Sequence, residues 1–202
     1  MFLDPIRIEP PEWLGPLLRA WPDRFADTTE AMGLAIALAR ENARQGGGPF
    51  GALVLEGASG RLVSAGVNRV LASHCAVAHA ELVALSIAQQ GLGTADLGAA
   101  LPGGCTLVSS AEPCAMCLGA IPWAGVTRLV CGARDRDVRA TGFDEGDKPA
   151  DWPAALARRG IHSIRDCRRA EAVAVLRRYA DAGGIIYGPA GPDAERPSLG
   201  AD

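Results

Sequence analysis

The sequence predicts an α/β domain of three layers, in which helices cover both faces of a central sheet. Five short apolar stretches read as strands, and they alternate with segments of helical periodicity, a pattern typical of layered α/β folds. The chain has 202 residues, of which 49% are hydrophobic, and this is enough for the core of one domain. We expect that domain to occupy residues 27–188, between an N-terminal arm (1–26) and a flexible C-terminal tail (189–202).

Closely spaced prolines in the arm prevent a long helix there. We expect an extended segment with one short helix, whose apolar residues between Leu14 and Trp21 pack on the domain surface. The first long helix should begin at a capping box, with Asp27 as the N-cap and Glu30 at the third helical position. It should run to about residue 45 and stop at the glycines of 46–48.

The remaining elements follow from periodicity and from turn residues. Two apolar runs flank a turn at 57–60, so we expect a hairpin, and a loop over 71–78 should lead from it into the next helix. Strands are predicted at 50–56, 62–70, 105–110, 127–132 and 161–165. Helices are predicted at 79–90, from about 114, at 153–159 and at 169–182. A loop with a helical turn is expected at 92–104, and a loop at 133–149.

Two short motifs carry the strongest functional signal. His79 is followed two residues later by Glu81, and Cys114 is followed three residues later by Cys117. One imidazole and two thiolates are three ligands for a tetrahedral zinc ion, and a catalytic site leaves the fourth position to water. Zinc lowers the pKa of that water to roughly 7. Both motifs open predicted helices, so the positive ends of two helix dipoles should stabilise the thiolates.

Glu81 lies on the first turn of its predicted helix, beside the metal ligands but not among them. A carboxylate in that place can take a proton from water and pass it to a leaving group. A redox pair is the alternative for the two cysteines, but such a pair usually follows the first strand of a thioredoxin-like unit. A purely structural zinc site is the second alternative, and it has no use for Glu81. Of the remaining cysteines, Cys105 and Cys131 fit the core, and Cys75 should lie near the mouth of the site.

The combination of H-x-E with P-C-x-x-C resembles the cytidine-deaminase-like zinc aminohydrolases over most of the chain, from about residue 28 to 187. The resemblance implies a mixed five-stranded sheet, with zinc bound by His79, Cys114 and Cys117. The segment 140–146 is similar to a loop of bacterial guanine deaminases of this fold, as are 78–81, 110–114 and 123–126. The subgroup therefore implies conversion of guanine to xanthine and ammonia, with the triazine ammeline as a side substrate.

The same resemblance implies roles for several further residues. In the subgroup, the glutamate that matches Glu145 is a second proton shuttle, with Asp144 as the alternative in this chain, and the phenylalanine that matches Phe143 packs near the base. Asn68 could offer a donor and an acceptor to the heterocycle, or could simply close a turn. Further contacts to the base are expected from Phe50, from the backbone N–H of Ala80 and from Trp123, which could equally be a core residue.

A tRNA adenosine deaminase is the first rival, because it would share the same zinc ligands. It would need a basic surface, whereas the net charge is -3 and the pI is about 5.6. Deaminases of cytosine, cytidine or guanosine are further alternatives. We therefore expect a small heterocyclic base as the partner, and neither nucleic acid nor a membrane, since no apolar run is long enough to span one.

Two further expectations concern assembly and location. The resemblance implies a homodimer in which the segment 185–187 lies across an active site, its own or that of the other subunit. The N-terminus shows no basic stretch followed by an apolar core, so we expect no secretion signal and a cytoplasmic protein.

Overall fold

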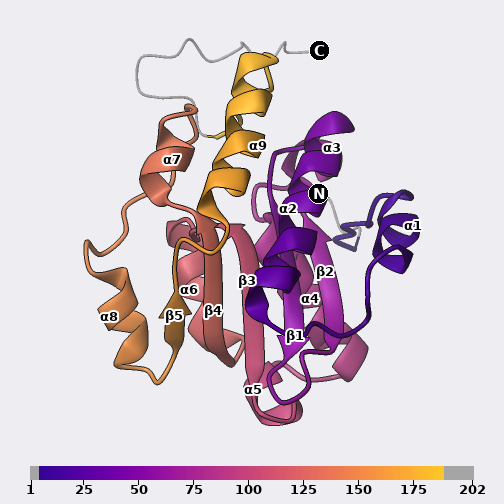
Figure 1. Cartoon of the computed structure of the whole chain (residues 1–202), viewed down its shortest axis with the longest axis vertical. Helices are drawn as coiled ribbons and strands as arrows, with labels where there is room; N and C mark the ends of the chain where they lie inside the picture. Colours follow the sequence, from indigo (N-terminus) through magenta and orange to yellow (C-terminus); the bar gives the residue numbers. More distant parts are fainter. Residues whose placement is uncertain (1–4, 189–202) are drawn as a thin grey trace.

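The structure is a computed structural model that describes residues 5–188; the predicted tail (189–202) and the first four residues of the arm lie outside the described residues. Five strands form one sheet in the order β2-β1-β3-β4-β5 (Figure 1). The strand β1 pairs antiparallel with β2 and β3, whereas β3, β4 and β5 are parallel, so the prediction of a mixed five-stranded sheet is confirmed. The strands are β1 (Gly51–Glu56), β2 (Leu62–Val67), β3 (Cys105–Ala111), β4 (Val126–Ala133) and β5 (His162–Ile164).

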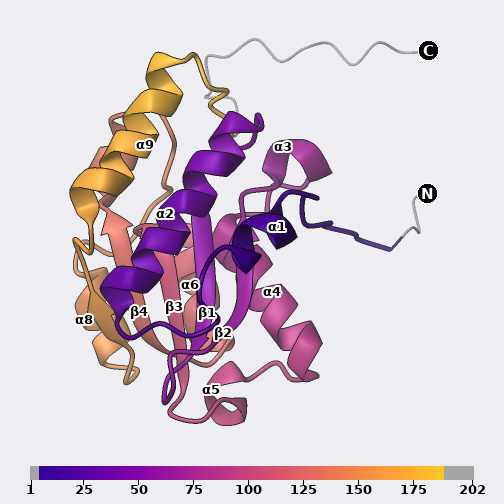
Figure 2. The same cartoon turned by 45° about the vertical axis from the view of Figure 1, so that its right-hand side comes forward.

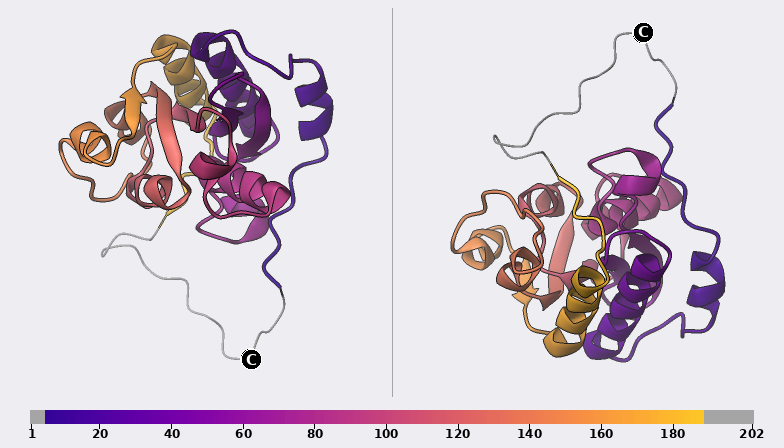
Figure 3. Two further views of the ribbon diagram at one scale, coloured as in Figure 1. Left: turned by 90° about the horizontal axis from the view of Figure 1, so that it is seen from below. Right: turned by 90° about the horizontal axis from the view of Figure 1, so that it is seen from above.

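Helices cover both faces of this sheet, as the layered prediction requires. One face carries α2 and α9, which lie side by side, and the other carries α4, α6 and α8 (Figures 2 and 3). None of the described helices is long and apolar enough to cross a membrane. The helices are α1 (Leu14–Arg19), α2 (Thr28–Arg44), α3 (Val70–Ser73), α4 (Ala80–Leu92), α5 (Leu97–Ala100), α6 (Ala115–Trp123), α7 (Asp135–Arg139), α8 (Trp152–Ala157) and α9 (Arg169–Asp181).

The helix α2 begins where the capping pattern placed it. The Asp27 side chain accepts hydrogen bonds from the backbone N–H groups of Thr29 and Glu30, at 2.8 and 2.9 Å. Glu30 in turn accepts from the N–H of Ala26, at 3.1 Å, so both sides of the cap are satisfied. In the arm, the predicted short helix is α1, and its Leu14 is buried in the core beneath α2.

Three predicted loops contain short helices, of which α5 is the helical turn expected within 92–104. The strand β2 ends at Val67 rather than at residue 70, because the Asn68 side chain accepts a hydrogen bond from the N–H of Val70 and turns the chain into α3. The charged segment predicted as a loop at 133–149 contains α7. Acidic residues in the first turn of α7 and basic residues in its last turn favour a helix here through its dipole.

The sheet topology brings four strand ends to one edge. Because β1 runs antiparallel to β2 and β3, its start lies beside the ends of both: Gly51 pairs with Val67, and Ala52 with Ser109. The parallel pair β3 and β4 ends at Ala111 and Ala133. The N-termini of α4 and α6 follow from β2 and β3, so they meet at this same edge of the sheet.

Close packing of α4 on β2 depends on one glycine. A Cβ atom at Gly66 would lie 2.4 Å from the carbonyl oxygen of Ala80 and 2.5 Å from the nitrogen of Ala84, both in the backbone of α4. A Cβ atom added at Gly91, in α4 itself, would meet no atom outside the local helix backbone within 4 Å. We therefore expect Gly66→Ala to lower the free energy of unfolding by about 1–3 kcal/mol through overpacking. Gly91→Ala should instead raise it by up to about 1 kcal/mol, because alanine favours a helix.

Denaturant unfolding of the two variants beside the unsubstituted chain measures both changes. Equal or greater stability of Gly66→Ala would show that α4 does not sit against β2 as described.

Candidate metal centre and active site

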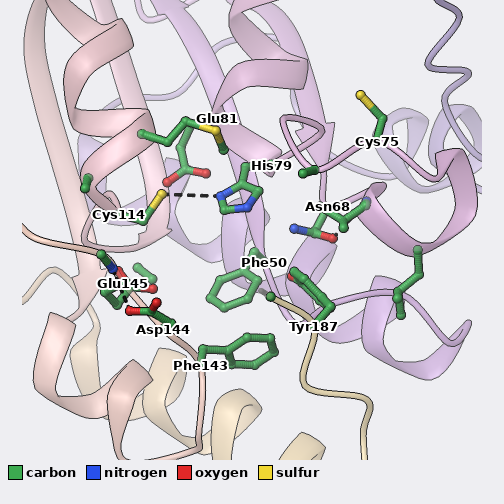
Figure 4. Close-up of a pocket in the computed structure, with 18 of the residues that line it drawn as sticks. Phe50, Asn68, Cys75, His79, Glu81, Cys114, Phe143, Asp144, Glu145 and Tyr187 are labelled. Atoms are coloured by element: carbon green, nitrogen blue, oxygen red, sulfur yellow. Dashed lines mark hydrogen bonds between the residues drawn. The ribbon is translucent and has the colours of Figure 1, made fainter. Parts of the chain in front are cut away.

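Three side chains converge where the two helices begin. His79 is the N-cap of α4 and Cys114 is the N-cap of α6. The Nδ1 atom of His79 lies 3.4 Å from the Sγ of Cys114 and 3.6 Å from the Sγ of Cys117 (Figure 4 shows the first pair). The three potential ligand atoms all lie within 4.8 Å of one another. One imidazole nitrogen and two sulfurs at this separation are a donor set that suits zinc, with one tetrahedral position left over.

The charges of the two cysteines also suit a cation. The pKa of Cys114 is lowered to about 4, first by a hydrogen bond from Cys117 and then by His79 and the backbone N–H of Cys117. The pKa of Cys117 lies well above its ordinary value, because the neighbouring Cys114 thiolate and burial both disfavour a second negative charge. A bound cation would offset this repulsion and favour the thiolate form of both cysteines.

Glu81 lies beside this cluster without belonging to it. It is the second residue of α4, and its side chain lies close to His79 and Cys114 (Figure 4). Only 6% of the residue is exposed, and burial raises the pKa of its carboxyl group, with the nearby Cys114 adding to the effect. The structure thus places a carboxyl group where the sequence predicted one, ready to exchange protons with anything bound at the cluster.

A cavity of about 790 Å³ opens over the cluster, within the range of small-molecule sites. The cluster lies on one side of it and an aromatic wall on the other (Figure 4). In that wall, Phe143 makes edge-to-face contacts with Phe50 and Tyr187, each with ring centroids 5.1 Å apart. Such a wall suits a flat heterocycle, which can stack on or edge against the rings.

Asn68 lines the cavity and is almost completely buried. Its position is fixed twice: its side-chain oxygen accepts from the N–H of Val70 at 3.2 Å, and its backbone oxygen accepts from the buried Asn42 side chain at 2.8 Å. Asn42 also donates to the carbonyl of Gly48, at 2.8 Å. Asn68 therefore closes a turn and also presents its amide group to the cavity, so the two interpretations of this residue are compatible.

Glu145 also reaches the cavity wall, from the loop after α7. Only 6% of it is exposed, and its pKa is raised to about 8, mainly by burial, while Lys148 opposes the rise and Cys114 adds to it. The loop is held against α6, since the N–H of Ala115 donates to the carbonyl of Glu145 at 2.9 Å. Asp144 lines the same cavity but its side chain is 63% exposed, so the geometry favours Glu145 over Asp144 as the buried acid.

Trp123 does not lie where the sequence analysis expected. It is the last residue of α6, is 85% exposed and does not line the cavity, so the predicted contact with the base is wrong, and so is the core alternative. The reason is helix geometry, because Trp123 lies nine positions after Cys114, about 13.5 Å further along the helix axis. Ala80 is fully buried and is not among the cavity residues, so a contact from its N–H stays a prediction.

Some cavity residues were missing from the predicted set of contacts. Tyr187 belongs to the segment expected to cross an active site, and it lines the cavity of its own chain. Its hydroxyl is buried and has no hydrogen-bond partner among the described residues. The α3 loop supplies part of the rim, including Cys75, whose place near the mouth is confirmed. Periodicity could not reveal these contacts, because they depend on how the chain folds back over the site.

Comparison with known proteins agrees with this geometry. Residues 26–133, more than half of the chain, match the family model described as the cytidine and deoxycytidylate deaminase zinc-binding region. The guanine deaminase of Bacillus subtilis strain 168 is 39% identical over 124 residues, which cover 58% of this chain and 75% of that protein. The tRNA(Ile)-lysidine synthase of Deinococcus deserti is 46% identical over 121 residues, 60% of this chain, but the match spans only 21% of that longer protein.

Solved structures extend the similarity to most of the chain. The guanine deaminase from Nitrosomonas europaea is 44% identical, with a TM-score of 0.84, over 90% of this chain and 99% of that one. A structure of the protein NE0047 in complex with 2,6-diaminopurine is 45% identical, with a TM-score of 0.83, over 91% of this chain and 97% of that one. By its family match, its fold and its cluster of one histidine and two cysteines, the chain belongs to the cytidine and deoxycytidylate deaminase family.

Proposed function

We propose that the chain is a zinc-dependent aminohydrolase that converts guanine to xanthine and ammonia. One observation carries the proposal: two buried carboxyl groups, Glu81 and Glu145, line the same cavity as the histidine–cysteine cluster. A purine that gains water and loses an amine needs protons moved at more than one atom, which two carboxyl groups can do. Similar proteins named guanine deaminase, and a similar structure that holds a diaminopurine, support this choice of base.

Zinc would be held by Nδ1 of His79 and by the Sγ atoms of Cys114 and Cys117. Its chemical contribution when bound is to lower the pKa of water, so that a nucleophile is available at neutral pH. The protein contributes two helix N-termini, which favour the thiolate forms of the ligands.

Glu81 and Glu145 divide the proton transfers in this mechanism. Glu81 accepts a proton from the attacking water, whose oxygen bonds to the ring carbon that carries the amine, and delivers this proton to the adjacent ring nitrogen. The new hydroxyl group then gives up its remaining proton, which a carboxyl group passes to the exocyclic nitrogen. The bond between carbon and that nitrogen breaks, ammonia leaves, and the oxygen stays on the carbon as the carbonyl of xanthine. Glu145, with its pKa raised to about 8, can exchange a proton near neutral pH and so can supply or hold a proton on the purine.

The remaining cavity residues bind and orient the base. Phe50, Phe143 and Tyr187 offer aromatic surface to its ring system, and Asn68 offers an amide group to its polar edge. The homodimer and the cytoplasmic location stay predictions based on the resemblance to this family. Tyr187 lines the cavity of its own chain, so the proposal does not require a segment from a second subunit.

Ammonia release from a panel of substrates tests the proposed function. With zinc-loaded protein, guanine should be the best of guanine, guanosine, ammeline, adenine, cytosine, cytidine and adenosine-bearing tRNA, because the aromatic wall and paired acids suit a free purine. Ammeline is expected as a weaker substrate. Formation of inosine in tRNA without turnover of guanine would overturn the proposal.

The variant Glu81→Gln separates catalysis from metal binding. It should keep its zinc and its melting temperature but lower kcat for guanine by about 10²- to 10⁴-fold, the usual contribution of a general acid–base group. Glu171→Gln, an isosteric change at an exposed position of α9, is the matched control and should behave as the unsubstituted enzyme. Activity that survives in Glu81→Gln would remove this residue from the mechanism.

Tyr187 should contribute to substrate binding. Tyr187→Ala is expected to raise KM for guanine about tenfold, because an aromatic contact and its buried surface are worth roughly 1–2 kcal/mol. The control is Ile185→Ala, two residues away and largely exposed, which should leave KM unchanged. Steady-state kinetics on both variants distinguishes them, and an equal KM in all three proteins would exclude Tyr187 from the binding site.

A further inference from the structure

Lys148 is the only lysine in the sequence, against nineteen arginines. Its side chain is only 6% exposed, and it lies three residues after Glu145 in the same loop. An ammonium group is a compact point charge, whereas a guanidinium is a broad planar fork. The chain thus uses its one compact cation at a buried position beside Glu145, which lines the cavity.

Two short contacts fix the ammonium group. Its Nζ lies 2.6 Å from Oδ1 of Asp135 and 2.8 Å from the carbonyl oxygen of Pro113. Asp135 is itself held by Arg139, at 2.7 Å. The first contact ties Lys148 to α7, and the second ties it to the residue before Cys114, at the start of α6. The position of this positive charge therefore does not depend on Glu145.

The contact between Lys148 and Glu145 is of a different kind. Nζ lies 3.6 Å from Oε2 of Glu145, within ion-pair range but too far for a hydrogen bond. Oε2 is buried and has no hydrogen-bond partner among the described residues. A buried carboxylate oxygen without a partner costs free energy, and here the nearby charge offsets part of that cost. It does so without occupying the oxygen in a hydrogen bond.

Other charged groups near Glu145 act against the effect of Lys148 on its carboxyl group. Cys114, Glu81 and Asp135 each disfavour its negative form, and Lys148 opposes them. Because these charges oppose one another, the Glu145 carboxyl group can gain or lose a proton at a low cost in free energy. It can exchange that proton with a substrate only while it stays against the cavity wall. A hydrogen-bonded ion pair would instead lock it in the ionised form.

We propose that Lys148 is a positioning residue for Glu145: anchored by Asp135 and by the Pro113 carbonyl, its ammonium group attracts the buried Oε2 and so keeps the carboxyl group at the cavity wall, with the other carboxyl oxygen left for the substrate. This inference rests on the proposed function, because that function gives the other carboxyl oxygen of Glu145 a substrate proton to exchange. Lys148 touches no reacting atom in this account, and it acts through Glu145 alone.

A double-mutant cycle tests whether Lys148 acts through Glu145. Lys148→Met, which keeps the length of the side chain but removes its charge, should lower kcat for guanine by roughly 10- to 100-fold, with KM and zinc content unchanged. In a Glu145→Gln background, the same substitution should change kcat by less than about threefold. Arg158→Met removes a cation from an exposed position at the end of α8 and should have no effect in either background.

A spectroscopic experiment gives a second test that does not depend on enzyme activity. It uses a variant that retains Lys148. Since the chain has one lysine, protein labelled with ¹³C at the lysine Cε gives one lysine resonance. That resonance should move in Glu145→Gln and stay in place in Glu171→Gln. It remains informative if Lys148→Met fails to fold.

The outcomes separate the two proposals. An equal loss of kcat from Lys148→Met with and without Glu145, or a lysine resonance indifferent to Glu145→Gln, would overturn the inference. If no substrate in the panel releases ammonia, the proposed function fails, and the lysine resonance alone then decides whether the two side chains are coupled. Full activity of Lys148→Met with guanine would refute the positioning role while leaving the proposed function intact.

Discussion

The structure depends on two helix N-termini that are held together at one edge of a sheet. His79 and Cys114 are N-cap residues, so each ligand sits where unpaired backbone N–H groups and the helix dipole favour negative charge. Gly66 allows α4 to pack closely on β2, and this packing fixes the position of His79 at the start of α4. Glu112 fixes the other side, because its carboxylate accepts from Arg165 and from the N–H of Asp135. Without this meeting of helices, the three ligand atoms would not converge.

The loop that carries Glu145 is tied to the same helix start as the cysteines. The N–H of Ala115 donates to the Glu145 carbonyl, and the ammonium of Lys148 donates to the Pro113 carbonyl. On the far side of the cavity, the buried Asn42 links the end of α2 to Asn68. Hydrogen bonds to backbone carbonyl groups therefore position Glu145 and Asn68 relative to the cluster, which is the rigidity that a catalytic arrangement requires.

Much of this could be predicted from the sequence, because local patterns determine it. The capping residues at Asp27 and Glu30 placed the start of α2, and motif spacing identified His79, Glu81, Cys114 and Cys117 as a group. The strands were predicted to within a few residues, since apolar runs bounded by turn residues are strong signals.

The errors concern two short helices in segments predicted as loops, and one exposed side chain. The helix α3 begins because the Asn68 side chain accepts from the next turn of backbone, and α7 is a charged helix that the sequence analysis took for a loop. The resemblance placed Trp123 at the base, with the core as the alternative, but the length of α6 carries it away from the cavity to an exposed position. Lys148 had a signal in the composition, as a single lysine among many arginines, and its importance appears only from its buried contacts.

X-ray absorption at the zinc edge tests the central claim most directly, because it counts the atoms around the metal. For zinc-loaded protein, the account predicts two sulfur neighbours at about 2.3 Å and two nitrogen or oxygen neighbours at about 2.0–2.1 Å. The two light neighbours would be the imidazole of His79 and one ligand that the protein does not supply. Four neighbours supplied by side chains, or a protein that binds no zinc at all, would contradict it.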